Sequence, residues 1–290
     1  MRKFLRGLWK VITFPFRLLW RVVTLPARGI RGAWRFVNAE PEDRPLSDSL
    51  ADTIKKPSTL VPHIEALRRH ILHMLIALLV GVAVCGVYTE QILEILARSI
   101  GGLQALQALD PTESVGVFMR VALFGGFALA LPYIAFEFWL FAAPGLRPRE
   151  RRIGLAGIPF ALAFFLGGIA FTYWLLLPTA LPFLLDFLGV TANWRLSTYI
   201  NFVTGLMFWI GVSFEFPLVI YVLTAMGIVK PGGLARQWRI AVIVIAVLAA
   251  AITPTPDPLN MSLVMLPMIL LYFLSIALSY LASAGRKKNA

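Results

Sequence analysis

Charged side chains are scarce in this sequence. Asp, Glu, Lys and Arg together make up 14% of its 290 residues, whereas a soluble globular domain has about 25%. Hydrophobic residues make up 59%, and the mean hydropathy is +0.78. This composition excludes an ordinary soluble domain. The apolar residues form long runs rather than the short alternating segments of a membrane β-barrel, so the sequence predicts an all-α integral membrane protein.

Residues suited to catalysis, redox chemistry and metal binding are also few. Cys85 is the single cysteine and lies in an apolar run, which excludes an internal disulfide. The chain has no glycine motif for phosphates or dinucleotides, and no nucleophile has a base beside it. His70 and His73 are three residues apart, but no cysteine or further histidine joins them, so a polar interface is favoured over a metal pair. We therefore expect no enzymatic activity, no cofactor and no metal.

Positive charge is abundant but unevenly placed. The chain has 27 Lys and Arg against 15 Asp and Glu, and 14 of the basic residues lie within residues 1–70. Most of the others gather at 147–152, 230–239 and 286–288, with almost none in the connections between these segments. Such alternation follows the positive-inside rule. It predicts six crossings of the cytoplasmic membrane with both termini in the cytoplasm, and attraction to anionic lipids rather than to nucleic acid.

The composition changes along the chain and predicts four parts. Residues 1–37 carry nine basic residues and no acid, and seven of the nine keep helical spacing. Together with Trp and Phe, this pattern favours a basic amphipathic helix on the membrane surface. A disordered basic tail is the alternative. Residues 38–60 are rich in acids and prolines and predict a polar linker. Residues 61–284 are expected to form the six-helix membrane domain, and 285–290 a basic tail.

The apolar runs place the crossings near 71–88, 115–138, 153–177, 201–223, 240–252 and 261–281. The fifth run is short: 13 residues of helix span roughly 20 Å, against a hydrocarbon core of about 30 Å. It predicts local thinning of the bilayer or an early end of the helix. Arg120 and Glu137 lie near helix ends, where long side chains can reach the interface. The pairs Gly125-Gly126 and Gly167-Gly168 suit close helix packing.

Glu215 is the only charged residue between Leu196 and Val229. An acid within hydrocarbon is costly, so it favours a functional interpretation by default. Residues 201, 204, 208 and 211 share its helical stripe, which is polar or small where the rest of the helix is apolar. The alternative is a neutral carboxyl that hydrogen-bonds a neighbouring helix and stabilises the bundle.

Two strips at cytoplasmic helix ends mix acids with arginines. They are residues 63–69 (HIEALRR) and 144–152 (PGLRPRERR). One interpretation is a solvated face on which the acids pair with their neighbours. The other is a docking site for a cationic peptide, because an arginine guanidinium binds a carboxylate through two parallel hydrogen bonds.

Four stretches occur in a recognisable order. They are 63–69, then 132–144 followed by Glu150-Arg151-Arg152, then Phe202-Val203 with 214–217 (FEFP), and then 252–254 (ITP) with Asp257. In this order they resemble the amino-terminal motif, the first cytoplasmic loop, the fourth helix and the last outer turn of the TatC family, the C subunits of twin-arginine protein translocases. The resemblance covers roughly residues 60–282. Ala66 departs from it where the family has a second Glu, and Glu137 stands where the family commonly has Gln.

The resemblance implies a concave six-helix bundle that acts as the core receptor for signal peptides bearing paired arginines. The signal-peptide-binding residues that it implies are Glu65, Arg68, Phe141, Glu150 and Arg151. It further implies that Glu215 is an intramembrane polar site and that Asp257 is a functional acid of the outer turn.

The resemblance also implies the partners and the energy source. The partners are single-span subunits of the TatA and TatB types, folded cargo proteins with twin-arginine signal peptides, membrane lipids and further copies of the chain, and the proton-motive force drives transport. A proton-coupled secondary transporter of a small solute, with Glu215 as its coupling residue, is the alternative. Such transporters usually have two related halves, and the sequence has no such repeat. A purely structural membrane scaffold is a third interpretation.

Overall fold

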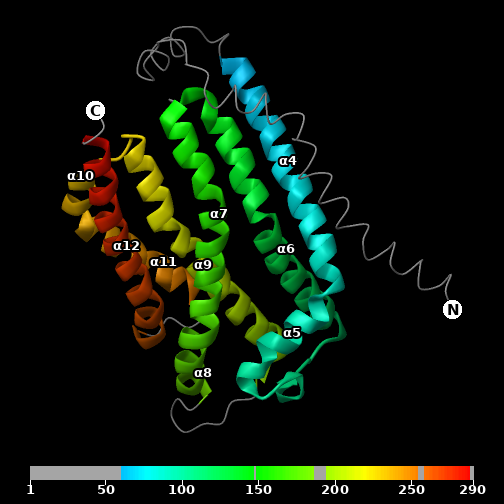
Figure 1. The fold of residues 1–290 in the computed structure, drawn as a ribbon. Coiled ribbons are helices and arrows are strands. Elements are labelled where there is room, and N and C mark those ends of the chain that lie inside the picture. The colour runs from blue at the N-terminus through cyan, green and yellow to red at the C-terminus, as the bar shows by residue number, and fades with distance from the viewer. Residues whose placement is uncertain (1–59, 147, 186–193, 254–257, 288–290) are drawn as a thin grey trace, which may run out of the picture.

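Long helices that run in alternating directions dominate the computed structural model of the protein (Figure 1). The structure describes residues 60–146, 148–185, 194–253 and 258–287. The predicted surface helix at 1–37, the linker except for its last residue, Asp257 and the end of the basic tail lie outside the described residues. The prediction of a helical membrane protein is confirmed.

Five stretches of helix are long and apolar enough to cross a membrane. They are α4 (Leu60–Val87), α6 (Pro111–Ala142), α7 (Pro148–Phe171) with its continuation, α9 (Leu196–Ala225) and α12 (Pro258–Lys287). The continuation of α7 is a π-helical turn, η6 (Thr172–Leu176), followed by α8 (Leu177–Leu185). Each corresponds to one of the predicted crossings and extends beyond it.

The fifth predicted crossing corresponds to the shorter apolar helix α11 (Trp238–Ile252). A six-residue helix, α10 (Pro231–Arg236), precedes it. The 15 residues of α11 span about 22 Å at about 1.5 Å per residue. A hydrocarbon core of about 30 Å is longer than this helix. The short fifth helix that the sequence predicts is therefore present in the structure.

Short elements connect the lower ends of the helices in Figure 1. They are α5 (Thr89–Ala97), the 3₁₀ turns η3 (Arg98–Ile100) and η4 (Leu103–Ala105), and the two-residue strands β1 (Leu106–Gln107) and β2 (Trp194–Arg195), which pair in parallel. At the opposite end, η5 (Ala143–Gly145) forms the turn between α6 and α7. The N-terminal end of α4, this turn and the C-terminal ends of α9 and α12 all lie at that end (Figure 1), which we call the α6–α7 end.

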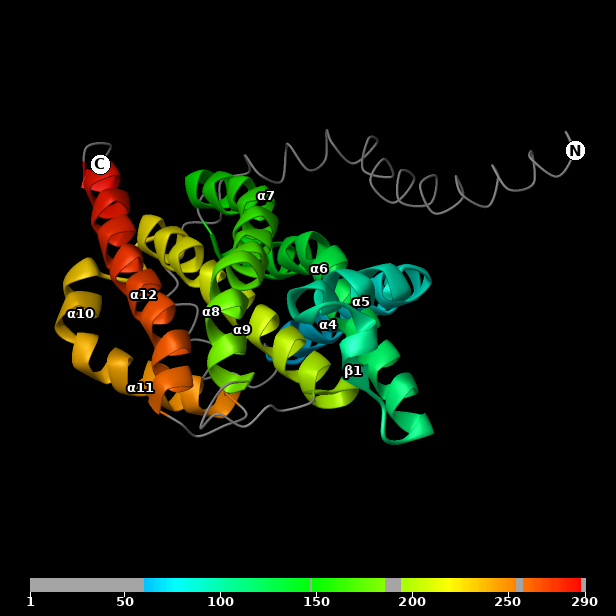
Figure 2. The ribbon, with the colours of Figure 1, turned by 90° about the horizontal axis from the view of Figure 1, so that it is seen from below.

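Helix α9 is the centre of the packing. Its fully buried residues include Tyr199, Ile200, Leu206 and Ile210, and it packs against α6, α7 and α12. In Figure 2 it runs obliquely between α12 and the pair formed by α4 and α6. Many large apolar side chains on the outer helix faces are exposed, as expected for a protein whose outer surface contacts lipid.

Two helix crossings bring backbones into direct contact at glycine. A Cβ on Gly126 of α6 would lie 2.5 Å from the backbone nitrogen of Val82 on α4. A Cβ on Gly168 of α7 would lie 2.7 Å from the Cα of Gly211 on α9. Gly167, in contrast, has open space at its Cβ position. The second glycine of each predicted pair therefore permits the close backbone contact.

Polar contacts fasten the start of α6 to the start of α9. Asp110 caps α6 by accepting from the backbone N–H and the hydroxyl of Thr112, and these hydrogen bonds lower the pKa of Asp110. The buried carboxylate of Glu113 accepts from the backbone N–H groups of Ser197, at 2.6 Å, and Leu109, at 3.1 Å. It also accepts from the guanidinium of Arg195, at 3.0 Å. The carboxylate thus links two helices that begin 85 residues apart.

Candidate functional site

The predicted docking residues lie on three helices that meet at the α6–α7 end. Glu65 and Arg68 are exposed near the start of α4. Phe141 is half-buried in the last turn of α6, and Glu150 is half-buried in the first turn of α7. The ring of Phe141 meets the imidazole of His70 on α4 edge-on, with 5.9 Å between ring centroids. Contact between α4 and the end of α6 therefore brings two of the three segments together.

Arg151 is the exception among these residues, because it is 4% exposed. Its Nε donates to the carbonyl of Ala143 at 2.7 Å, and its Nη2 lies 3.5 Å from the carbonyl of Pro144. The indole N–H of Trp139 donates to the backbone carbonyl of Arg151 at 3.0 Å. The guanidinium thus binds carbonyl groups at the C-terminal end of α6, where a helix leaves acceptors unpaired and favours positive charge. It fixes the turn that presents Glu150.

Glu137 does not extend to the surface as expected from its place near a helix end. Its side chain is 4% exposed and lies between α6 and α4. One carboxylate oxygen is 2.6 Å from Nδ1 of His70, the other is 3.3 Å from Nδ1 of His73, and the hydroxyl of Tyr133 also hydrogen-bonds it. The expectation of a surface acid was wrong because the histidines, 67 and 64 residues earlier, provide partners inside the bundle.

This arrangement also bears on the expectation that no metal binds. The ligand atoms of His70, His73 and Glu137 all lie within 4.8 Å of one another. The two histidines are recognisable in the sequence as a pair, whereas the Glu137 carboxylate that faces them was not predicted. The signal that could have found it is the depth of these residues in the bundle. Helices α4 and α6 are consecutive long helices that run in opposite directions, so the start of α4 lies beside the end of α6.

Arg120 likewise has a partner within the bundle. Its Nε donates to the hydroxyl of Thr204 on α9 at 3.1 Å, and its Nη2 donates to the backbone carbonyl of Asn201 at 3.4 Å. These contacts hold two members of the polar stripe that leads to Glu215. The arginine therefore links α6 to α9.

Glu215 lies on α9, one turn beyond the Gly168–Gly211 crossing. The ring of Phe165 covers Gly211 so closely that a Cβ there would lie 2.8 Å from it. The Glu215 side chain is half-buried, and its Oε1 is buried with no hydrogen-bond partner among the residues that the structure describes. Buried polar atoms without a partner are rare and costly. The backbone of Phe165 on α7 nevertheless hydrogen-bonds the Glu215 carboxyl. The interpretation of Glu215 as a carboxyl bonded to a neighbouring helix is therefore supported by this contact, although Oε1 itself has no partner among the described residues.

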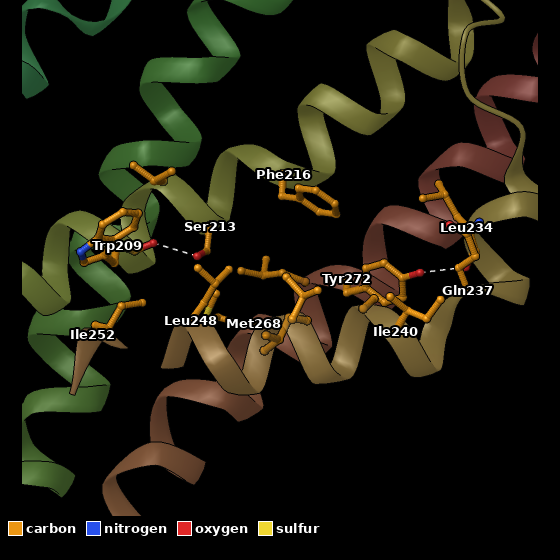
Figure 3. Close-up of a pocket in the computed structure, with 15 residues that line it drawn as sticks. Trp209, Ser213, Phe216, Leu234, Gln237, Ile240, Leu248, Ile252, Met268 and Tyr272 are labelled. Carbon is orange, nitrogen blue, oxygen red and sulfur yellow. Dashed lines mark hydrogen bonds between the residues drawn. The ribbon is translucent and has the colours of Figure 1, made fainter. Parts of the chain in front are cut away.

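An apolar cavity that the sequence analysis did not predict lies on another side of α9 (Figure 3). It has a volume of about 390 Å³ and is lined by residues of α9, α11 and α12, with two from the α10 region. Both of its hydroxyl groups are hydrogen-bonded: Ser213 donates to the carbonyl of Trp209, and Tyr272 donates to that of Leu234, both at 2.7 Å. The cavity therefore offers shape and apolar surface rather than reactive groups.

Comparison with known proteins identifies the same family from sequence and from structure. The family model for the Sec-independent protein translocase protein (TatC) matches residues 62–267. A TatC of Deinococcus radiodurans is 38% identical over 248 residues, which cover 82% of this chain and 91% of that protein. A TatC of Koribacter versatilis is 35% identical over 257 residues, with 85% and 94% covered.

Two solved structures have the same fold. A crystal structure of the twin arginine translocase receptor TatC superimposes with a TM-score of 0.69 at 33% identity, covering 76% of this chain and 99% of that one. The same receptor in DDM gives a TM-score of 0.68 at 32% identity. The matched region coincides with the described helices and leaves the basic N-terminal segment outside the family model.

Proposed function

The chain belongs to the TatC family of Sec-independent protein translocase proteins, and from this premise we propose that it is the receptor that binds twin-arginine signal peptides. It is a multi-pass membrane protein and a transport component rather than a catalyst. The observation that carries the proposal is that two of the four motif stretches, residues 63–69 and 132–144 with 150–152, meet at one end of the bundle. That end presents carboxylates in an otherwise basic surrounding.

The number of carboxylates able to receive two arginines is small. Among the described residues, the acids at the α6–α7 end are Glu65, Glu137 and Glu150. Glu137 is buried, with 4% of its side chain exposed, whereas Glu65 is exposed and Glu150 is half-buried. We therefore assign recognition of the arginine pair to Glu65 on α4 and Glu150 on α7. With Ala66 in place of the family's second Glu, we assign the larger share to Glu150.

The remaining predicted residues support this pair of acids. Phe141 offers an apolar surface beside the site, anchored by its contact with His70. Arg68 is exposed on the same helix as Glu65 and is proposed to contact the signal peptide as well. Arg151 acts as a positioning residue, because its guanidinium is bound to the carbonyl groups of the turn that presents Glu150.

The proposed topology has six crossings and both termini in the cytoplasm, with α11 as the short fifth crossing. The basic segments at 147–152, 230–239 and 286–288 support it through the positive-inside rule. This arrangement puts the α6–α7 end in the cytoplasm, where signal peptides arrive, and Asp257 outside. The short α11 thins the bilayer beside the receptor, which lowers the barrier to a folded cargo.

Transport itself requires more than this chain. We propose that it assembles with TatA- and TatB-type single-span subunits and with further copies of itself in the cytoplasmic membrane, and that the proton-motive force drives the cycle. The family membership supports the assembly, and the sequence contains no motif for nucleotide hydrolysis. Glu215, half-buried in the membrane-spanning part of α9, is the polar site on which the membrane-embedded step depends.

The test is retention of a signal peptide by the purified protein in detergent. The wild-type protein should retain a peptide with Arg-Arg and release one with Lys-Lys, because lysine cannot form the paired hydrogen bonds of a guanidinium. Glu150→Gln should weaken binding of the Arg-Arg peptide by about 10–100-fold, the effect of losing one charge-assisted hydrogen bond of about 1.5–3 kcal/mol.

The matched control is Glu90→Gln, an exposed acid on α5 at the opposite end of the bundle. This variant should bind the peptide as the wild-type protein does. Equal affinity of the wild type and Glu150→Gln for the Arg-Arg peptide would place the docking site elsewhere.

A further inference from the structure

Two histidines and one glutamate converge between α4 and α6, close to the docking residues but separate from them. His70 and His73 are three residues apart on α4, so both project from one face of the helix. Glu137 reaches them from α6, and each of its oxygens faces a different imidazole, at 2.6 and 3.3 Å from Nδ1. No other His, Cys, Asp or Glu in the described part of the chain joins a group of three with this spacing.

We propose that His70, His73 and Glu137 form a binding site for a divalent transition-metal ion of the Zn²⁺ class. Two imidazoles and one carboxylate are a ligand set that Zn²⁺ and Co²⁺ accept, whereas Mg²⁺ and Ca²⁺ prefer oxygen ligands alone. Three protein ligands leave a fourth position for water, as in open zinc sites. The proposal does not depend on signal-peptide binding.

The distances are close to those of such a site. In a tetrahedral site with bonds of about 2.0–2.1 Å, ligand atoms lie about 3.3 Å apart. His73 Nδ1 lies 3.3 Å from Oε1 of Glu137, whereas His70 Nδ1 lies 2.6 Å from the other oxygen, Oε2. An ion held by one of these oxygens therefore requires the carboxylate to turn and its hydrogen bond with His70 to be replaced by metal–ligand bonds. All ligand atoms start within 4.8 Å of one another.

The surroundings provide both support and access. The Tyr133 hydroxyl hydrogen-bonds Glu137, and such an outer contact orients a ligating carboxylate. The Glu137 side chain is 4% exposed, whereas that of His73 is 46% exposed, so an ion can enter from the His73 side. Because the metal holds residues of α4 and α6 together, it joins the two helices. It also fixes the imidazole against which Phe141 packs.

Binding of Co²⁺ and Zn²⁺ to the purified full-length protein tests the site. The protein is freed of any histidine tag, stripped with a chelator and titrated with Co²⁺, whose visible absorption reports tetrahedral coordination by nitrogen and oxygen ligands. One equivalent should bind, Zn²⁺ should displace it, and Zn²⁺ should raise Tm by mass action. His70→Ala, His73→Ala and Glu137→Gln should each weaken Co²⁺ binding by at least about tenfold.

The control variant is His63→Ala, which removes the remaining histidine of the chain from the same helix α4 and should leave the Co²⁺ spectrum unchanged. Glu137→Gln retains hydrogen-bonding capacity toward both imidazoles, so its fold can be verified by an unchanged Tm without metal. The proposal is overturned if the wild-type protein binds no Co²⁺, or if the three variants bind it as the wild type does. If the wild-type protein binds Co²⁺ but does not retain the Arg-Arg peptide, the result counts against the docking proposal alone.

Discussion

The crossing of α7 and α9 provides a sharp test of the structure, because it contains two adjacent glycines with opposite environments. A Cβ on Gly168 would lie 2.7 Å from the Cα of Gly211 and 3.1 Å from its nitrogen. A Cβ on Gly167 would meet nothing within 4 Å. The same substitution to alanine at neighbouring positions therefore differs in one respect, the contact with α9.

The size of the effect follows from these distances. An ordinary Cβ contact begins at 3.4 Å, so Gly168→Ala must separate α7 and α9 by about 0.7 Å. The atoms in contact belong to backbone and cannot rotate away. Overpacking of this kind costs about 1–3 kcal/mol, whereas the gain in helix propensity from Gly to Ala, up to about 1 kcal/mol, is common to both variants.

Thermal unfolding in detergent, followed by the fluorescence of the eight tryptophans, gives the measurement. Gly168→Ala should melt below Gly167→Ala by about 2–12 °C, since about 1 kcal/mol shifts Tm by roughly 2–4 °C in chains of comparable size. Gly167→Ala should melt at or slightly above the wild-type temperature. Equal Tm values for the two variants would refute the close crossing, and with it the position of Glu215 one turn further along α9.

Three further predictions address the polar contacts and the short helix. Glu113→Gln should lower Tm, because the carboxylate that accepts from Arg195 and from two backbone N–H groups is lost. The exposed Glu94→Gln serves as its control, and an equal loss of Tm in both variants would contradict the role of Glu113. Glu215→Gln should leave the free energy of unfolding within about 0.5 kcal/mol of the wild-type value but impair transport of a folded cargo. Unimpaired transport would favour a structural role for Glu215. Insertion of four apolar residues into α11 adds about 6 Å and should reduce the bilayer thinning beside the protein in nanodisc density maps; uniform thickness around the wild-type protein would disprove the thinning.

The centres of the long helices could be predicted from the sequence, whereas their ends could not. Hydropathy marks the residues that need hydrocarbon, but the backbone hydrogen bonds of a helix continue into the interface. Helix α4 therefore starts at Leu60, 11 residues before the predicted crossing. The π-helical turn at Thr172–Leu176 also gave no signal, because its apolar composition does not differ from that of a regular helix.

The sequence indicates which polar groups lie at a similar depth in the bundle, but it does not determine which of them face one another. His70 and Glu137 are 67 residues apart, and Arg120 and Thr204 are 84 apart. Their pairing depends on the rotation of each helix about its axis, which the apolar pattern of a helix surrounded by lipid leaves nearly undetermined. The pairing of Glu113 with Arg195 could not be predicted for the same reason. The rotation of a helix about its axis decides whether an acid near its end faces water or a neighbouring helix.

The buried charges in this bundle have partners that fix helix ends, and this narrows where recognition can occur. Glu113 fastens α6 to α9, Glu137 binds the histidines of α4, and Arg151 binds the carbonyl groups of the α6–α7 turn. An incoming arginine pair would have to break these contacts to use the same groups, at the cost of leaving a buried charge unpaired. Glu65 is exposed and Glu150 is half-buried, so a peptide can reach these two acids without entering the interior of the bundle. We therefore expect the buried charges to hold the helix ends in place and the acids nearer the surface to contact the signal peptide.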